Sequence, residues 1–192
     1  MAMPLAAHRF TVDEYHRMGQ AGVFHEDDRV ELIDGQVVEM SPIGPRHAAC
    51  VDRLNRHLSQ RVSDRAIVRV QNPVVLGRHA APQPDVALLH PPIERYADAH
   101  PETPDIILVI EVADTSGDYD RAVKIPLYAR AGIPEAWLVD LAAGIIEVFR
   151  QRDRAGERHP RLSRWRAFTD RSECASQLAA RHRPVNGRGT AA

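Results

Sequence analysis

The chain has 192 residues, of which 44% are hydrophobic and 27% are charged, values typical of one globular domain rather than a disordered chain. Its longest apolar run, Ile106 to Ile110, is far shorter than the roughly 20 residues of a membrane helix, so we expect no membrane partner and a cytoplasmic location. The net charge of −1 argues against binding nucleic acid mainly through a large positive field, but it leaves a local basic groove open.

The first predicted elements are a helix, a hairpin and a second helix. Thr11 opens a capping-box pattern with a glutamate three residues later, which predicts a short helix through Met18. Residues 29–40 alternate around Asp34-Gly35, a strong signal for two antiparallel strands. In residues 45–62, apolar side chains recur at helical spacing with arginines on the other flank, which predicts an amphipathic helix packed on a sheet.

The middle of the chain is expected to form the sheet. Residues 66–76 and 85–89 have the composition of strands, joined by a loop over residues 77–84. The proline-rich segment 91–104 is expected to be a surface loop. Residues 106–112 (IILVIEV) are apolar enough for a central strand that is buried on both faces.

The last predicted elements are a helix and a hairpin. Residues 120–132 have a helical pattern, with Pro126 placed near the first turn and Gly132 as a C-terminal stop. Residues 136–140 and 144–150 then predict a second hairpin. Strands, a flanking helix, more strands, a helix and a closing hairpin together predict an α/β fold, a mixed sheet flanked by helices.

We expect one domain over residues 1–150, followed by an atypical tail over residues 151–192. The segment 150–188 holds eleven arginines against four acidic residues and has few apolar residues at a regular spacing. Such a segment suits a basic arm that binds nucleic acid, and it equally suits a poorly ordered C-terminus.

Three residues carry the strongest chemical signal. Lys124 is the single lysine in the chain, and its compact ammonium offers chemistry that the planar arginine fork does not. Asp85 begins one predicted strand and Glu111 interrupts the most apolar one, so adjacent strands would bring both carboxylates to one edge of the sheet. Burying a charge there is costly without a cation, and Mg²⁺ is a natural partner. Two carboxylates, a metal ion and a nearby ammonium are the parts that phosphodiester hydrolysis requires.

Four sequence blocks in this order resemble one known family. The blocks are RVELIDGQVVEMSPIGPRHA, QPDVALL, ILVIEVADTS and DRAVKIPLYARAGIPEAWLVD. They resemble the signature blocks of the Uma2 family, formerly a domain of unknown function, whose members are described as restriction endonuclease-like. The resemblance covers about residues 10–150, and it implies the PD-(D/E)XK nuclease core, an open mixed sheet with flanking helices.

The resemblance also implies roles for the three residues. Asp85 matches the aspartate of the first half-motif, and Glu111 matches the acidic residue of the second. Both would hold a divalent metal, Mg²⁺ or Mn²⁺, with Val112 as a further metal-binding position. The second half-motif departs from the superfamily pattern, because Ala113 stands where a lysine is usual. Lys124 in the following helix occupies the position to which this family has moved the lysine.

Further residues match the family blocks. Glu31 matches a glutamate that assists metal binding in related nucleases, and a solvent-facing strand glutamate is an equal alternative. His47 is expected near the substrate or in a local hydrogen bond at a helix start. Gln83 and Asp120 also match, although a loop amide and a helix N-cap explain them. Tyr128 is expected to pack rather than to catalyse.

The predicted function is that of a metal-dependent DNA endonuclease in which Asp85 and Glu111 hold the metal, Lys124 positions water and Glu31 assists. Two alternatives stay open: a catalytically silent nucleic-acid-binding or assembly module with the same fold, and a phosphodiesterase that acts on a substrate other than DNA. A homodimer is expected, because two sites are the simplest way to cut both strands of a duplex.

Overall fold

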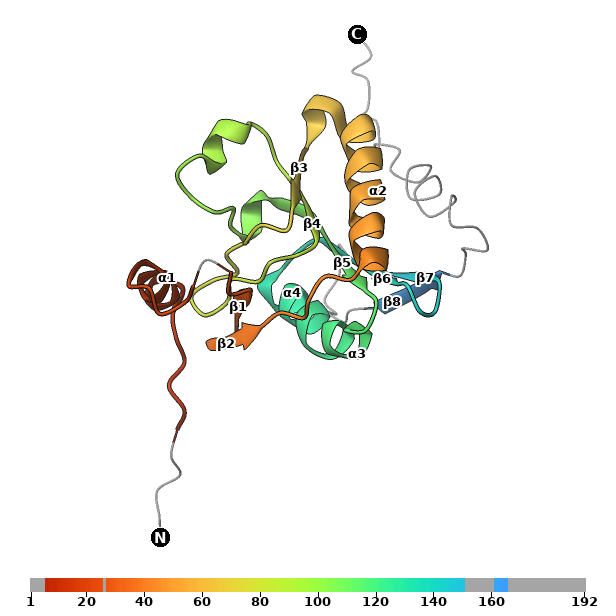
Figure 1. Ribbon diagram of the computed structural model, residues 1–192. Helices are drawn as coiled ribbons and strands as arrows, with labels where there is room; N and C mark the ends of the chain where they lie inside the picture. The colour runs from red at the N-terminus through yellow and green to blue at the C-terminus, as the bar shows by residue number, and fades with distance from the viewer. Residues whose placement is uncertain (1–5, 26, 151–160, 166–192) are drawn as a thin grey trace.

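The structure is a computed structural model that describes residues 6–25, 27–150 and 161–165 (Figure 1). Two antiparallel strands, β1 and β2, form a small sheet, and the remaining strands form the main sheet. In chain order the helices and strands are α1 (Val12–Gln20), β1 (Val30–Ile33), β2 (Gln36–Glu39), α2 (Pro45–Val62), β3 (Ile67–Val70), β4 (Val86–Leu89), β5 (Ile106–Ala113), α3 (Gly117–Tyr119), the π-helical turn η4 (Asp120–Lys124), α4 (Ile125–Ala131), β6 (Glu135–Asp140), β7 (Ile145–Arg150) and β8 (Arg161–Trp165).

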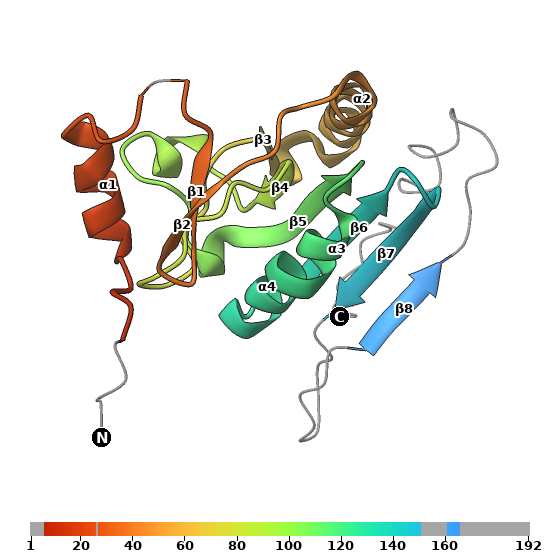
Figure 2. The same cartoon turned by 60° about the horizontal axis from the view of Figure 1, so that its bottom comes forward.

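The main sheet has the strand order β3-β4-β5-β6-β7-β8. β5 and β6 run parallel, and the other neighbouring pairs are antiparallel, so the sheet is mixed as predicted. Helix α2 covers one face and α4 covers the other (Figure 2). Side chains of β4 alternate between the two cores, because Val86 and Leu88 pack with Leu54 of α2 while Ala87 and Leu89 pack with the α4 side.

Strand β5 is central, and its burial explains its nearly continuous apolar sequence. Leu108, Val109 and Ile110 are fully buried between the two helical layers. A strand covered on both faces needs apolar side chains at successive positions rather than at alternate ones. Glu111 lies in this same strand and is also buried, so its carboxylate must find polar partners inside the protein.

The helix after β5 begins earlier than predicted and contains a wider turn. It starts at Gly117, and Pro126 therefore lies within the helical segment rather than in its first turn. A proline inside a helix lacks an N–H group and clashes with the carbonyl four residues earlier. The π-turn η4 ends two residues before Pro126, and at its end the Ile125 N–H donates to the Asp120 carbonyl, five residues back. We attribute the π-turn to this proline.

Strand β3 is shorter than predicted, because the chain leaves the main sheet after Val70. Gln71 has a φ of 50°, and the following Pro73 has no N–H group for a strand ladder. Residues 74–81 instead fold back on themselves and reach the small sheet, where Ala81 N–H donates to the Leu32 carbonyl over 2.8 Å. The predicted strand 66–76 is therefore correct only over its first half.

Two further segments differ from expectation or extend it. The expected surface loop 91–104 contains short 3₁₀ turns at Ile93–Tyr96 and Thr103–Asp105. Strand β8, which was not predicted, extends the sheet beyond residue 150 by pairing with β7. The rest of the predicted tail, residues 151–160 and 166–192, lies outside the described residues.

In the described part of the chain, no helix combines the length and apolar character needed to cross a membrane.

The turn between β1 and β2 generates the first prediction. Gly35 has a φ of 81°, and a Cβ added there would lie 2.7 Å from Cβ of Arg9. Gly77 has a similar φ of 75°, but a Cβ there would meet no atom within 4 Å. Gly35→Ala should therefore destabilise the protein more than Gly77→Ala, which should cost only about 1–2 kcal/mol for its left-handed backbone. Urea unfolding measures both, and equal losses would contradict a close approach of Arg9.

Candidate active site

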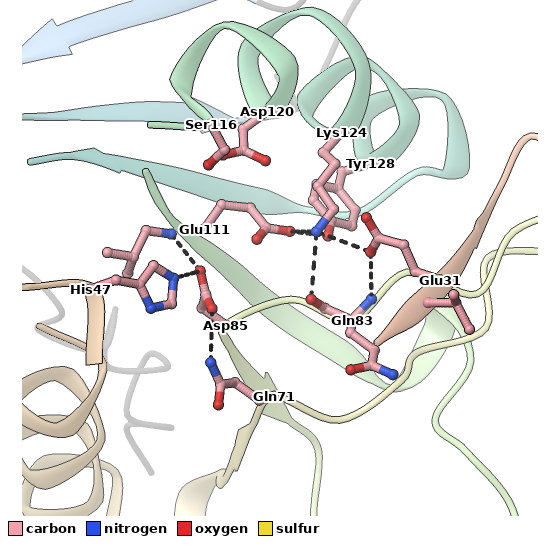
Figure 3. A network of polar contacts seen from close by, with 12 residues as sticks. Glu31, His47, Gln71, Gln83, Asp85, Glu111, Ser116, Asp120, Lys124 and Tyr128 are labelled. Atoms are coloured by element: carbon pink, nitrogen blue, oxygen red, sulfur yellow. Dashed lines mark hydrogen bonds and ion pairs between the residues drawn. The ribbon is translucent and has the colours of Figure 1, made fainter. Parts of the chain in front are cut away.

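A cavity of about 510 Å³ lies where the small sheet, the ends of β4 and β5, and the helix after β5 meet. Four carboxylates with exposed fractions of only 3% to 8% line it, those of Glu31, Asp85, Glu111 and Asp120. Lys124, which is 4% exposed, lines it as well. The structure therefore gathers the sequence-predicted acids and lysine in a single cavity (Figure 3).

Strand pairing brings the two central carboxylates together. Val86 of β4 pairs with Ile110 of the antiparallel strand β5. The residue before Val86, Asp85, and the residue after Ile110, Glu111, therefore lie at the same end of the strand pair. Asp85 precedes β4 directly and Glu111 lies inside β5. The expectation that neighbouring strands place both carboxylates at one edge is thus met by the geometry.

Asp85 is held by three donors from three elements. The Val112 main-chain N–H donates to its Oδ2 over 2.8 Å, and Nε2 of His47 lies 3.0 Å from the same oxygen. Nε2 of Gln71 donates to Oδ1 over 3.3 Å. His47 stands in the first turn of α2, and Gln71 adopts the positive φ that ends β3. The irregular backbone at Gln71 therefore helps to fix a carboxylate of the site.

Lys124 lies between two carboxylates. Its Nζ is 3.1 Å from Oε2 of Glu31 and 3.1 Å from Oε1 of Glu111. The main chain of Gln83 completes this arrangement, because its N–H donates to Glu31 over 3.1 Å and its carbonyl accepts from Lys124 over 3.5 Å. Gln83, which matches the family blocks and was a candidate for contacting the substrate or supporting the site, thus joins the network through its backbone (Figure 3).

Tyr128 adds a contact to this network, and Asp120 lines the same cavity. Tyr128 is fully buried, and its hydroxyl donates to Oε1 of Glu111. Tyr128 packs in the core as expected, and it also contacts the site. Asp120 accepts a 2.6 Å hydrogen bond from Ser116, so it is a buried acid of the cavity rather than only a helix cap. Asp120, Lys124 and Tyr128 recur every four residues, which is the one signal that would have placed them on a common helix face.

The position of the lysine has a steric explanation. Ala113, where the superfamily pattern has its lysine, is 1% exposed and packs in the core that α4 covers. A Cβ on Gly117 would lie 3.6 Å from the Ala113 Cβ, so the first turn of the helix lies directly over this position. A long side chain at residue 113 would displace that turn, and Lys124 reaches the carboxylates from the helix instead.

The charges of the cavity are unbalanced. Six carboxylates line it, four of them buried, together with the guanidinium of Arg29, the ammonium of Lys124 and the imidazole of His47. Burial raises the pKa of Glu111 to about 8, although the nearby Lys124 opposes this rise. Burial also raises the pKa of Asp120, against the Ser116 hydrogen bond that favours its charged form. Burial would lower the pKa of Lys124, but Glu111 and Glu31 outweigh it and keep the ammonium charged. The hydrogen bond to Asp85 raises the pKa of His47.

This donor set fits a hard divalent ion. In the described residues, no group of three or more His, Cys, Asp or Glu side chains is arranged to hold a metal ion. Mg²⁺ does not require such a cage, since proteins commonly hold it through one or two carboxylates together with waters and substrate phosphates. Asp85 and Glu111 supply these carboxylates, and an added cation would offset the excess of negative groups around them.

Comparison with known proteins identifies a sequence family and a structural neighbour. A sequence model of the family described as "Uma2: Putative restriction endonuclease" matches residues 12–173. A crystal structure of "a putative nuclease belonging to DUF820 from Anabaena variabilis ATCC 29413" superposes with a TM-score of 0.62 at 17% identity, covering 80% of this chain and 83% of that one. At this identity the likeness concerns the fold, and it confirms the predicted restriction endonuclease-like core. No curated protein matches the sequence.

The buried lysine generates a stability prediction. Lys124→Met removes the ammonium between two buried carboxylates, and it should destabilise the protein by about 3–5 kcal/mol, because an unpaired buried charge is costly. Arg130→Met, in the same helical segment, removes an exposed ion pair with Asp34 and should cost at most about 1 kcal/mol. Chemical unfolding in EDTA compares the two. Similar small losses in both variants would show that Lys124 does not compensate the carboxylates.

The raised pKa of Glu111 predicts a pH dependence of the metal-free protein. Between pH 4.5 and about 8 the folded state holds a proton on Glu111 that the unfolded chain releases. This contribution to stability is full below pH 4.5 and is lost as the pH rises through 8. Wild type should therefore lose stability relative to Glu111→Gln between pH 5 and pH 8.5. Parallel unfolding curves for the two proteins would contradict the raised pKa.

Proposed function

Because the chain belongs to the Uma2 family of putative restriction endonucleases, we propose that it is a DNA endonuclease that depends on Mg²⁺ or Mn²⁺. The family and the fold support nuclease activity. The dependence on a metal ion and the DNA substrate are proposed from the site itself. The observation that carries them is the pair of buried carboxylates, Asp85 and Glu111, beside the single lysine of the chain.

In this proposal Asp85, Glu111 and Val112 hold the ion. The N–H of Val112 already contacts Asp85, and in an extended strand the carbonyl of the same residue points to the same side. The Asp85 carboxylate is oriented before any ion arrives, because three donors fix it. A bound divalent ion supplies a polarised phosphate and a water of lowered pKa.

Lys124 and Glu31 act together rather than separately. The ammonium lies 3.1 Å from each of Glu31 and Glu111, so it fixes the orientation of the metal-binding Glu111. Its positive charge also lies where negative charge develops on the phosphate, and it favours the attacking water on that side. Glu31 assists by holding the lysine in place.

His47 supports the site from α2. Its Nε2 contacts Asp85, and its side chain lines the same cavity with an exposed fraction of 15%. The hydrogen bond to Asp85 raises the pKa of His47 and thereby favours a positive imidazolium. In our proposal His47 keeps Asp85 oriented toward the ion.

The test is Mn²⁺-dependent cleavage of supercoiled plasmid and of single-stranded DNA. Asp85→Asn and Glu111→Gln preserve side-chain size and remove the charges that hold the ion, so both should lose cleavage by at least about 100-fold. The matched control is Asp52→Asn on the exposed side of α2, away from the cavity, which should cleave like wild type.

Isothermal titration of Mn²⁺ into each variant separates metal binding from chemistry. Loss of both Mn²⁺ binding and cleavage in the two site variants supports the proposal. Wild-type binding of Mn²⁺ without cleavage of any DNA would favour the silent binding module. Cleavage of a generic phosphodiester without cleavage of DNA would instead favour a different substrate.

A further inference from the structure

The mouth of the cavity is formed by two connections with an unusual property. One is the segment that leads from β2 to α2, and the other is α3 with the segment that leads into it from β5. Each carries an exposed apolar side chain that lines the cavity, namely Ile43, with an exposed fraction of 41%, and Tyr119, with 36%. In the part of the chain that the structure describes, only Val23 and Ile93 are other large hydrophobic residues with such exposure. Half of these side chains therefore stand at a single cavity.

The floor of this cavity is deep. Asp85 is 8% exposed and Glu111 is 3% exposed, so a scissile phosphate must enter the cavity to reach them. A volume of about 510 Å³ lies in the range of pockets that enclose small ligands. A DNA duplex is stiff over about 150 base pairs and keeps its bases stacked inside. A single strand bends at each nucleotide and offers the face of each base to an aromatic ring.

We propose that the substrate segment which enters the cavity is single-stranded DNA, with a phosphate toward Asp85 and Glu111 and an adjacent base stacked on Tyr119 and in contact with Ile43. The identity of the ligand as DNA rests on the function proposed above; the preference for a single strand comes from the shape and the apolar mouth of the cavity.

Tyr119 is well placed for this role. It is the last residue of α3 and directly precedes Asp120, which is fixed by its hydrogen bond to Ser116. One helical segment thus carries both the exposed Tyr119 and the buried Lys124, which line the same cavity.

A single-stranded substrate changes what the protein requires of a second subunit. The homodimer was predicted because two sites are the simplest way to cut both strands of a duplex. One cut in one strand requires one site, so the inferred substrate does not depend on pairing of two chains. The homodimer stays a prediction of its own.

The test is fluorescence anisotropy of a labelled oligothymidylate, alone and annealed to its complement, with the full chain in Ca²⁺. Ca²⁺ takes the same oxygen ligands, and a denaturing gel verifies that the strand stays intact. Wild type should bind the single strand at least about tenfold more tightly than the duplex. Tyr119→Ala and Tyr119→Leu should each weaken single-strand binding by about tenfold, because a stacked base contributes about that much, whereas Tyr119→Phe should bind like wild type.

Ile93 provides the matched control. Ile43→Ala should weaken single-strand binding by about threefold, and Ile93→Ala, which removes a more exposed isoleucine away from the cavity, should not. Equal or tighter binding of the duplex, or unchanged binding by both Tyr119→Ala and Tyr119→Leu, would overturn the inference. Cleavage separates the two proposals: cleavage that prefers duplex defeats only the single-strand inference, and tight single-strand binding without any cleavage defeats only the endonuclease.

Discussion

The ammonium of Lys124, held between Glu31 and Glu111, is the interaction on which the rest of this structure depends. Glu31 belongs to the small sheet, Glu111 to the central strand of the main sheet, and Lys124 to the helix that covers it. Carboxylates this deeply buried need a cation nearby, and without one they would favour water and pull the small sheet away. The same contact therefore joins the two sheets and assembles the site. Stability and function share one set of side chains here, so both respond when any one of them changes.

Much of the architecture follows from local patterns. The capping box at Thr11 forms as predicted, with its hydroxyl accepting from the Glu14 N–H, and the Asp34-Gly35 turn joins β1 to β2. These features depend on neighbouring residues only, so a sequence displays them directly. The apolar run of β5 likewise predicted a buried central strand, because only a strand covered on both faces needs such a run.

The misses depend on contacts between distant segments. Gln71 ends β3 with a positive φ and hydrogen-bonds Asp85, 14 residues later in the chain, which no local pattern indicates. Tyr128 was expected to pack, and its hydroxyl contact with Glu111 depends on how the helix lies on β5. Lys124 was predicted as a site residue on a different ground, because it is the single lysine in a chain whose other basic residues of this class are all arginines. The π-turn was not predicted, because a helix that starts at Asp120 would place Pro126 near its first turn, where a proline is tolerated.

The single lysine also allows local opening of this protein to be measured by chemical modification. Amine-directed reagents find a single side chain in the sequence, and that side chain is 4% exposed. In the folded protein such reagents should be confined to the terminal amine, whereas any opening that separates the small sheet from the helix uncovers Lys124. A protease specific for lysine likewise has one cut site, between Lys124 and Ile125, at the end of the π-turn. The rate of acylation or of cleavage at this position would thus report the rate of local opening of the cavity, without an introduced probe.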